Sequence, residues 1–189
     1  KRIKEKLPVI QQSLPEDVVI ESFLDRTDLV GRAMTTVQKN LIEGALIVIF
    51  VLILFLGNIR AGLIVASVIP LSMLFALSMM RLFGVSANLM SMGAIDFGLV
   101  VDGSLIVVEA TMYHLGMRKT TNKLTQNEMD EEVFESARKI RTSAAFGEII
   151  ILIVYIPILT LVGIEGKMFT PMAQTVSFAI LGALILSFT

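Results

Sequence analysis

The 189-residue chain is too apolar for an average soluble domain. Hydrophobic residues make up 54% of it and charged residues only 17%, whereas charged residues form roughly 25% of a typical soluble protein. The mean hydropathy is +0.78, and this composition predicts a multi-span membrane protein. The formal charge of -1 gives no argument for nucleic acid as a partner. Because the chain has no cysteine, it offers neither disulfides nor thiolate metal ligands.

Residues 1–26 are the only segment that looks soluble. A short amphipathic helix is expected near the start, and residues 18–24 read as a β-strand. A helix followed by a strand, with no room for a core of its own, indicates the end of a larger α+β domain. The chain opens without Met or a signal-like segment and stops within an apolar run. We therefore expect an internal fragment of a longer protein.

Five apolar segments follow, of lengths suited to helices that cross about 30 Å of hydrocarbon. The expected spans are 27–57, which includes an extension outside the membrane, 61–80, 89–113, 144–163 and 171–189, the last one truncated. The predicted fold class is thus mainly α, a polytopic membrane helix bundle of five spans with a short N-terminal α+β piece.

Residues 115–142 form the one long polar connection. Thr125 and Glu128 fit a capping box, which starts an amphipathic helix expected along the membrane surface. Lys and Arg in the loops set the topology. Seven lie on the side of this connection and two on the opposite side: Arg60, Arg118, Lys119, Lys123, Arg138, Lys139 and Arg141 against Arg81 and Lys167. This excess places 115–142 in the cytoplasm and the N-terminal piece outside.

The span 89–113 carries three carboxylates, Asp96, Asp102 and Glu109. An ionisable residue at membrane depth is a functional-site hypothesis by default. In one continuous helix, Asp102 and Glu109 would lie within about 20° of one face, and Asp96 about 120° round from Asp102. We expect the Asp102 face to point at other helices, because small residues share its line. The opposite side would face lipid, and it holds Phe97, Val100, Val107 and Val108.

No Lys or Arg falls within the membrane interior of any expected span, so the three acids have no cationic partner within the membrane part of this chain. A carboxylate left unpaired in an apolar medium tends to take up a proton. Either the acids titrate during function or their partner lies on other helices, and both options point to proton coupling or cation passage. A fourth acid, Glu148, lies in span 144–163, where it could snorkel to the boundary or support a relay.

These residues resemble a known family. Asp96-Phe97-Gly98, Val101-Asp102-Gly103 and Val108-Glu109 look like the fourth transmembrane helix of heavy-metal-efflux pumps of the resistance-nodulation-division superfamily, closest to the cobalt-zinc-cadmium type. Further likenesses follow in the family's order along the chain, among them Leu14-Pro15-Glu16, Asp25-Arg26-Thr27, the segments 54–60 and 69–72, and 163–169. The resemblance covers essentially the whole chain and makes residues 1–26 the end of a periplasmic porter subdomain.

The resemblance implies a secondary active transporter and not an enzyme. Such pumps are proton-driven homotrimers of the bacterial inner membrane that work with a periplasmic adaptor and an outer-membrane channel to expel divalent cations. By likeness, Asp102 would be the proton carrier, paired with a Lys outside this chain, while Glu109 and Asp96 match the family's other two acids. An acid at Asp96 favours zinc, cobalt, cadmium or nickel over copper and silver. No cofactor is implied, and the metal-binding residues are not identified.

Three alternative functions are retained. One is a pump of the same superfamily for organic compounds, which paired adjacent aspartates would favour; here Gly103 follows Asp102. Another is a Sec-associated component of proton-driven protein export, which uses similar helices. The third is a passive cation channel, in which Asp102 would form a selectivity ring and flux would need no pH gradient.

Overall fold

The computed structural model describes residues 6, 10–12, 14–15, 20, 26–86, 88–118 and 125–188. The chain divides into two compact units, Lys1–Thr36 and Val37–Thr189. Every regular element described is a helix. The strand expected over 18–24 lies outside the described residues apart from Ile20, so the N-terminal α+β piece stays a prediction.

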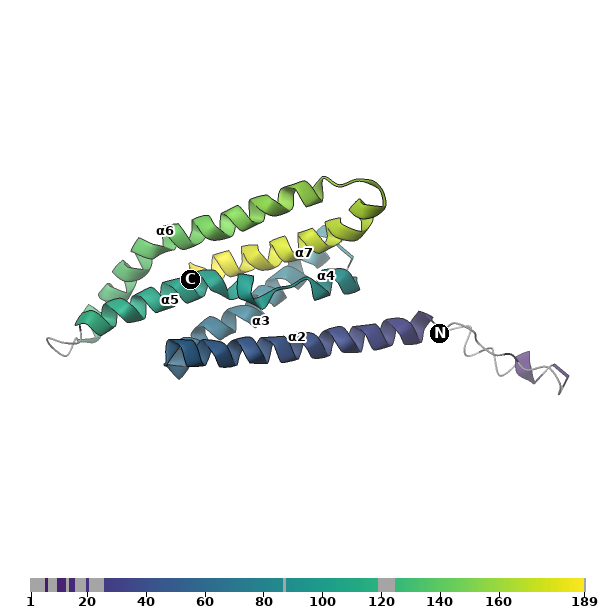
Figure 1. Cartoon of the computed structure of the whole chain (residues 1–189), viewed down its shortest axis with the longest axis horizontal. Helices are drawn as coiled ribbons and strands as arrows, with labels where there is room; N and C mark the ends of the chain where they lie inside the picture. The colour runs from purple at the N-terminus through teal and green to yellow at the C-terminus, as the bar shows by residue number, and fades with distance from the viewer. Residues whose placement is uncertain are drawn as a thin grey trace. The chain divides into compact units, whose positions relative to one another are not determined.

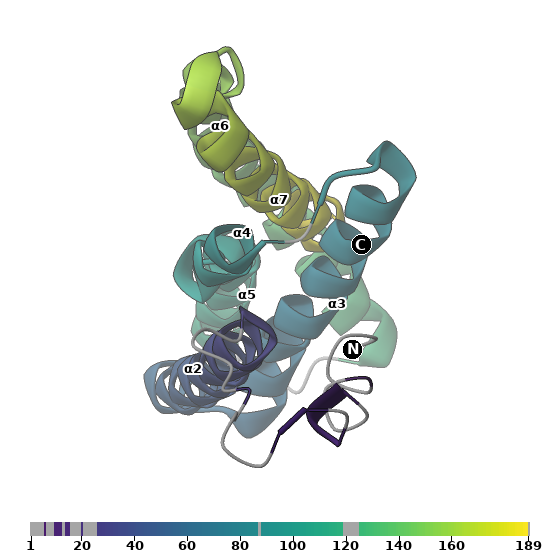
Figure 2. The same ribbon diagram turned by 90° about the vertical axis from the view of Figure 1, so that its right-hand side faces the viewer.

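Six helices are described. They are α2 (Arg26–Leu56), α3 (Ile59–Phe83), α4 (Leu89–Gly93), α5 (Phe97–Arg118), α6 (Gln126–Leu159) and α7 (Gly163–Ser187). Within the second unit, α6 and α7 run side by side and α5 packs on both, as Figures 1 and 2 show. Helix α3 packs against α5 and α7, and the short α4 packs against α7.

Local chemistry explains where α3 begins and ends. The Asn58 side-chain oxygen accepts hydrogen bonds from the backbone N–H groups of Arg60 and Ala61, at 3.0 and 3.4 Å, which satisfies donors left free at a helix start. Gly84 ends the helix with φ 67°, a left-handed conformation that glycine adopts without steric cost.

The long polar connection is built differently from the expectation. The sequence separates an amphipathic helix within 115–142 from a span at 144–163, whereas α6 runs without a break from Gln126 to Leu159. Its start is as expected, because the Glu128 carboxylate accepts hydrogen bonds from both Thr125 N and Thr125 Oγ1 at 2.8 Å. One helix therefore carries the charged segment directly into the apolar one.

The core of the second unit has two apolar clusters, and α3 contributes to both. The first joins Leu52 of α2 to residues of α3 and α5; its other buried members are Val65, Ile69, Phe97 and Val101. The second joins α3, α5 and α7 through Val68, Ala76, Val100, Ala179 and Ala183. The small residues in the second cluster allow close helix approach, which fixes α5 against α3 and α7.

Candidate functional site

The acid-bearing segment is broken and not one continuous helix. Helix α4 ends at Gly93, and α5 begins only at Phe97. Between them, the Asp96 carboxylate accepts a hydrogen bond from the backbone N–H of Gly98 at 2.8 Å, the bond that a helix-capping residue makes. The expectation that Asp96 lies about 120° round the same helix from Asp102 is therefore wrong. Asp96 stands before the helix and caps it.

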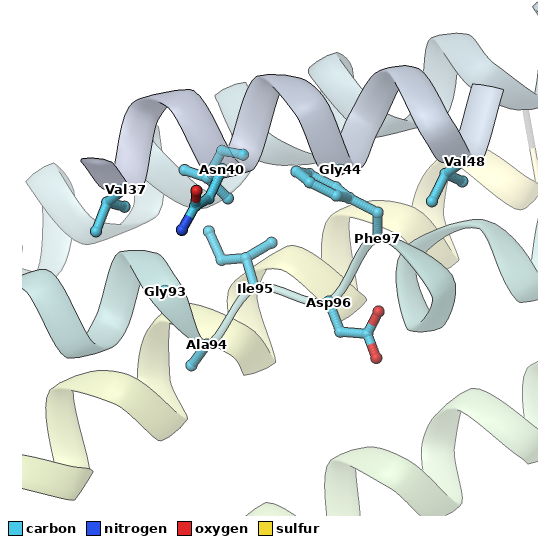
Figure 3. Close-up of a pocket in the computed structure, with 10 residues that line it drawn as sticks. Val37, Asn40, Gly44, Val48, Gly93, Ala94, Ile95, Asp96 and Phe97 are labelled. Atoms are coloured by element: carbon cyan, nitrogen blue, oxygen red, sulfur yellow. The ribbon is translucent and has the colours of Figure 1, made fainter. Parts of the chain in front are cut away.

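A cavity of about 420 Å³ opens beside this break, on the side of α2. Asn40 and Gly44 of α2 line one wall, and the residues of the break line the other. Figure 3 shows the Phe97 ring lying against Gly44, while the Asp96 carboxylate points away from α2. The cavity wall is mainly apolar, although Asp96 is among the residues that line it.

The two remaining acids of α5 lie on a face that this chain leaves exposed. Asp102 and Glu109 are both exposed, whereas Phe97, Val100 and Val101 are buried at 7%, 2% and 3% exposure. The expectation that Phe97 and Val100 face lipid is therefore wrong, because they pack in the two core clusters. The residues of this chain bury the apolar side of α5 and leave its acid side uncovered.

Glu148 lies at the contact between α6 and α5 and is only 3% exposed, so it does not snorkel to a boundary within this structure. A Cβ atom on Gly103 would overlap the Glu148 carboxylate, so the glycine leaves the space that the carboxylate occupies. Neither Gly103 nor the adjacent Ser104, which is 7% exposed, was singled out from sequence as part of the site. The sequence signal that could have indicated this site is Gly103, which directly follows Asp102.

The acids are not paired with cations in the described part of the chain. None of Asp96, Asp102, Glu109 and Glu148 forms an ion pair with a described Lys or Arg. Over the same residues, no three His, Cys, Asp or Glu side chains lie close enough together to hold a metal ion. The arrangement is thus suited to binding protons or to meeting charged groups supplied by other helices.

The lengths of the helices and their exposed apolar side chains define the class of protein. Among the described residues, five helical segments are long and apolar enough to cross a membrane: Thr27–Leu56, Ile59–Phe83, Leu89–Met117, Gln126–Leu159 and Gly163–Ser187. Large apolar side chains are exposed along them, including Leu54 at 65% and Phe55 at 67%, as suits contact with lipid or with further helices. The fold is that of a multi-pass membrane helix bundle.

Comparison with known proteins identifies the family. The AcrB/AcrD/AcrF family matches residues 1–189, and the chain belongs to it. The chain is 50% identical over 191 residues to the cobalt-zinc-cadmium resistance protein CzcA of Cupriavidus metallidurans, covering 100% of this chain. It is 44% identical over 189 residues to the nickel and cobalt resistance protein CnrA of the same organism, covering 99%. The resemblance to heavy-metal-efflux pumps is therefore confirmed.

A solved structure supports the same relationship. The chain superposes on an X-ray crystal structure of a heavy metal efflux pump with a TM-score of 0.78 and 38% identity, over 98% of this chain and 18% of that one. The chain likewise spans only 18% of the length of the two relatives named above. The chain thus corresponds to less than a fifth of each of these proteins.

Proposed function

We propose that the full-length protein expels divalent heavy-metal cations across the bacterial inner membrane in exchange for protons, with α5 as the proton-carrying helix. The observation that carries this proposal is the uncovered acid face of α5, where Asp102 and Glu109 lie on an apolar span without a described cationic partner. Acids in such a setting bind protons or pair with charges from other helices. The names of the relatives add zinc, cobalt, cadmium and nickel as substrates.

The acids have different roles in this proposal. Asp102, at the level of the α5–α6 contact, is the carrier that loads and releases the proton. Glu109 is seven residues further along α5, about two helical turns towards the proposed cytoplasmic side, and passes protons between Asp102 and that surface. Asp96 caps α5 from the other end and contributes negative charge near the break.

The surrounding assembly follows from the family resemblance. The N-terminal piece is periplasmic and residues 115–142 are cytoplasmic, as the loop charges indicate. The protein forms a homotrimer and works with a periplasmic adaptor and an outer-membrane channel, so that cations leave the cell envelope and do not re-enter from the periplasm.

The test is flux of zinc and cobalt into or out of liposomes that contain the full-length protein, driven by an imposed pH gradient. We expect gradient-dependent flux in the native protein and loss of that flux to the level of protein-free liposomes in Asp102→Asn. Glu131→Gln is a matched control, because Glu131 is exposed in the charged first part of α6 and outside the relay. It is expected to transport normally.

Other outcomes would reassign the function. Equal flux with and without the gradient, in both native protein and Asp102→Asn, would show a passive channel and end the pump proposal. Gradient-driven movement of organic compounds without movement of metals would place the protein with the exporters of organic compounds.

A further inference from the structure

Glu148 is an isolated acid within a long apolar stretch. It is the only charged residue of α6 after Arg141, and at 3% exposure it is among the most buried polar residues described. Residues that are buried and ionisable within a membrane span are rarely retained for packing alone. Its position at the α5–α6 contact therefore calls for a role.

The α5 surface is shaped to receive the Glu148 carboxylate. Any side chain on Gly103 would overlap that carboxylate, beginning with its Cβ atom. Asp102 directly precedes this glycine on α5, beside the place where the Glu148 carboxylate packs. One carboxyl group from each of the two helices thus lies at the same level of the α5–α6 contact.

Nothing in the described part of the chain neutralises Glu148 or hydrogen-bonds to it. Both of its carboxylate oxygens are buried without a hydrogen-bond partner there, and so is the Ser104 hydroxyl. Two helices pack against α6, namely α5 and α7. On α5 the charged groups towards Glu148 are Asp102 and, further along, Glu109; α7 has no charged residue from Met168 to Ser187. Arg141, seven residues earlier on α6, is cationic but forms no described ion pair with Glu148, so no described charge neutralises the carboxylate.

An ionised carboxylate in such surroundings is strongly disfavoured, because it has lost its hydration and gained neither a counter-ion nor hydrogen bonds. A second negative charge nearby disfavours it further, so that two carboxyls sharing one site resist being ionised together. The geometry thus favours a pair that holds one proton between its two members.

We propose that Glu148 is a second proton-binding carboxyl of the relay, seated on Gly103, and that it exchanges its proton with Asp102 during transport. In this step the proton leaves a Glu148 carboxyl oxygen and binds an Asp102 carboxylate oxygen, so the pair keeps a single negative charge. The inference rests on the proposed function for its role in transport, but the proton on Glu148 can be measured without it.

The direct test is an infrared pH titration of the full-length protein in liposomes, which follows the C=O band of protonated carboxyl groups. We expect the native protein to show a protonated carboxyl at neutral pH and Glu148→Gln to lose that band. Should Glu148→Gln fail to fold, Gly103→Ala provides a second route, because it keeps Glu148 but displaces its carboxyl and should shift the band. Gly116→Ala and Gly147→Ala are matched controls, since a Cβ on either meets nothing within 4 Å.

Transport provides a second readout. Coupled carboxyls titrate as a pair over a broad pH range, so Glu148→Gln, which leaves a single carboxyl, should narrow the pH range over which metal flux changes and move its midpoint by about one pH unit. A residue with only a packing role would lower flux at every pH without moving the midpoint.

Two results would overturn the inference. One is a protonated-carboxyl band at neutral pH that is identical in native protein and Glu148→Gln, which would mean that Glu148 is ionised and paired elsewhere. The other is an unchanged pH profile of flux in Glu148→Gln. Loss of gradient dependence in the native protein would instead refute the proposed function, while the infrared result on Glu148 would stand.

Discussion

The α3–α7 contact and the α5–α6 contact are both close helix pairs, but they treat buried polar groups differently. At the first, Ser72 Oγ donates to the Ile69 carbonyl at 3.0 Å, and Thr175 Oγ1 donates to the Pro171 carbonyl at 2.7 Å. At the second, the Glu148 carboxylate has no partner among the described residues, and the hydroxyl of Ser104, the residue after Gly103 on α5, has none either. The buried hydroxyls of the first contact are satisfied by hydrogen bonds within this chain. The buried carboxylate of the second contact can still bind a proton or a group from another helix.

This difference distinguishes buried polar groups that only support helix packing from buried polar groups that have a function in the membrane. Hydroxyls that bond to their own helix cost little and add modestly to packing. Buried polar groups without partners cost free energy, so they persist where a proton, an ion or another helix uses them. Substitutions at the two contacts should therefore differ in their effects on stability and on transport.

The largest effect on stability is expected from Ile180→Ala in α7. Ile180 is 1% exposed, and removing a buried isoleucine side chain typically costs about 2–5 kcal/mol of unfolding free energy. Ile185→Ala on the same helix is the control, because Ile185 is 52% exposed. Reversible unfolding in mixed detergent measures both. A pH-dependent flux profile that moved in Ile180→Ala would contradict a purely structural role for the buried side of α7.

Gly182→Ala should disturb the same contact by overfilling it. A Cβ on Gly182 would lie 2.8 Å from Cδ1 and 3.1 Å from Cβ of Phe75, so α3 or α7 must shift. Overpacking of this kind costs about 1–3 kcal/mol, measured relative to Gly116→Ala, which has open space at its Cβ and reports the helix-propensity gain alone. Equal stability of the two variants would mean that the helices separate easily.

Asp96 allows its capping role to be separated from its charge. Asp96→Ala should lose the cap of α5 and about 1 kcal/mol of stability, whereas Asp96→Asn keeps a capping oxygen and should stay near the native value. If the charge of Asp96 matters for transport, Asp96→Asn will lower gradient-driven flux without loss of stability. Thermal unfolding and liposome flux on the same preparations distinguish the two roles. Equal destabilisation of both variants would show that the hydrogen bond to Gly98 is not a cap.

The smallest changes in the free energy of unfolding are expected from two serine substitutions, and these changes should differ in sign. Ser72→Ala removes a hydroxyl that donates to a carbonyl of its own helix and should lose about 0.5 kcal/mol, the lower end of the net contribution of an intramolecular hydrogen bond. Ser104→Ala removes a buried hydroxyl without a described partner and should be neutral or slightly stabilising. Unfolding in mixed detergent measures both. A loss in Ser104→Ala as large as in Ser72→Ala would reveal a partner on another helix.

Local sequence signals were sufficient for several features. The runs of apolar residues predicted five membrane-type helices, and the part of the chain that the structure describes contains five. The capping box at Thr125 is confirmed because both of its partners lie within four residues of chain. The three acids of 89–113 were also recognisable, since a carboxylate in an apolar run is conspicuous without any knowledge of its neighbours.

The faces of α5 were not predictable in the same way. Helical periodicity says which residues share a side, but lipid and protein interior are both apolar, so the pattern does not say which side is packed. The sequence placed Phe97 and Val100 towards lipid, and the structure buries both. The break before Phe97 was missed because Asp96 was read as a site residue and not also as a helix cap.

The sequence by itself thus determined the membrane class, the approximate spans and the acids that mark the site, because each depends on the composition of a short segment. Only the tertiary structure decided which side of α5 is packed and how the Glu148 carboxylate fits against Gly103. Glu148 and Gly103 are 45 residues apart in the chain, and their contact exists only because α6 folds back along α5.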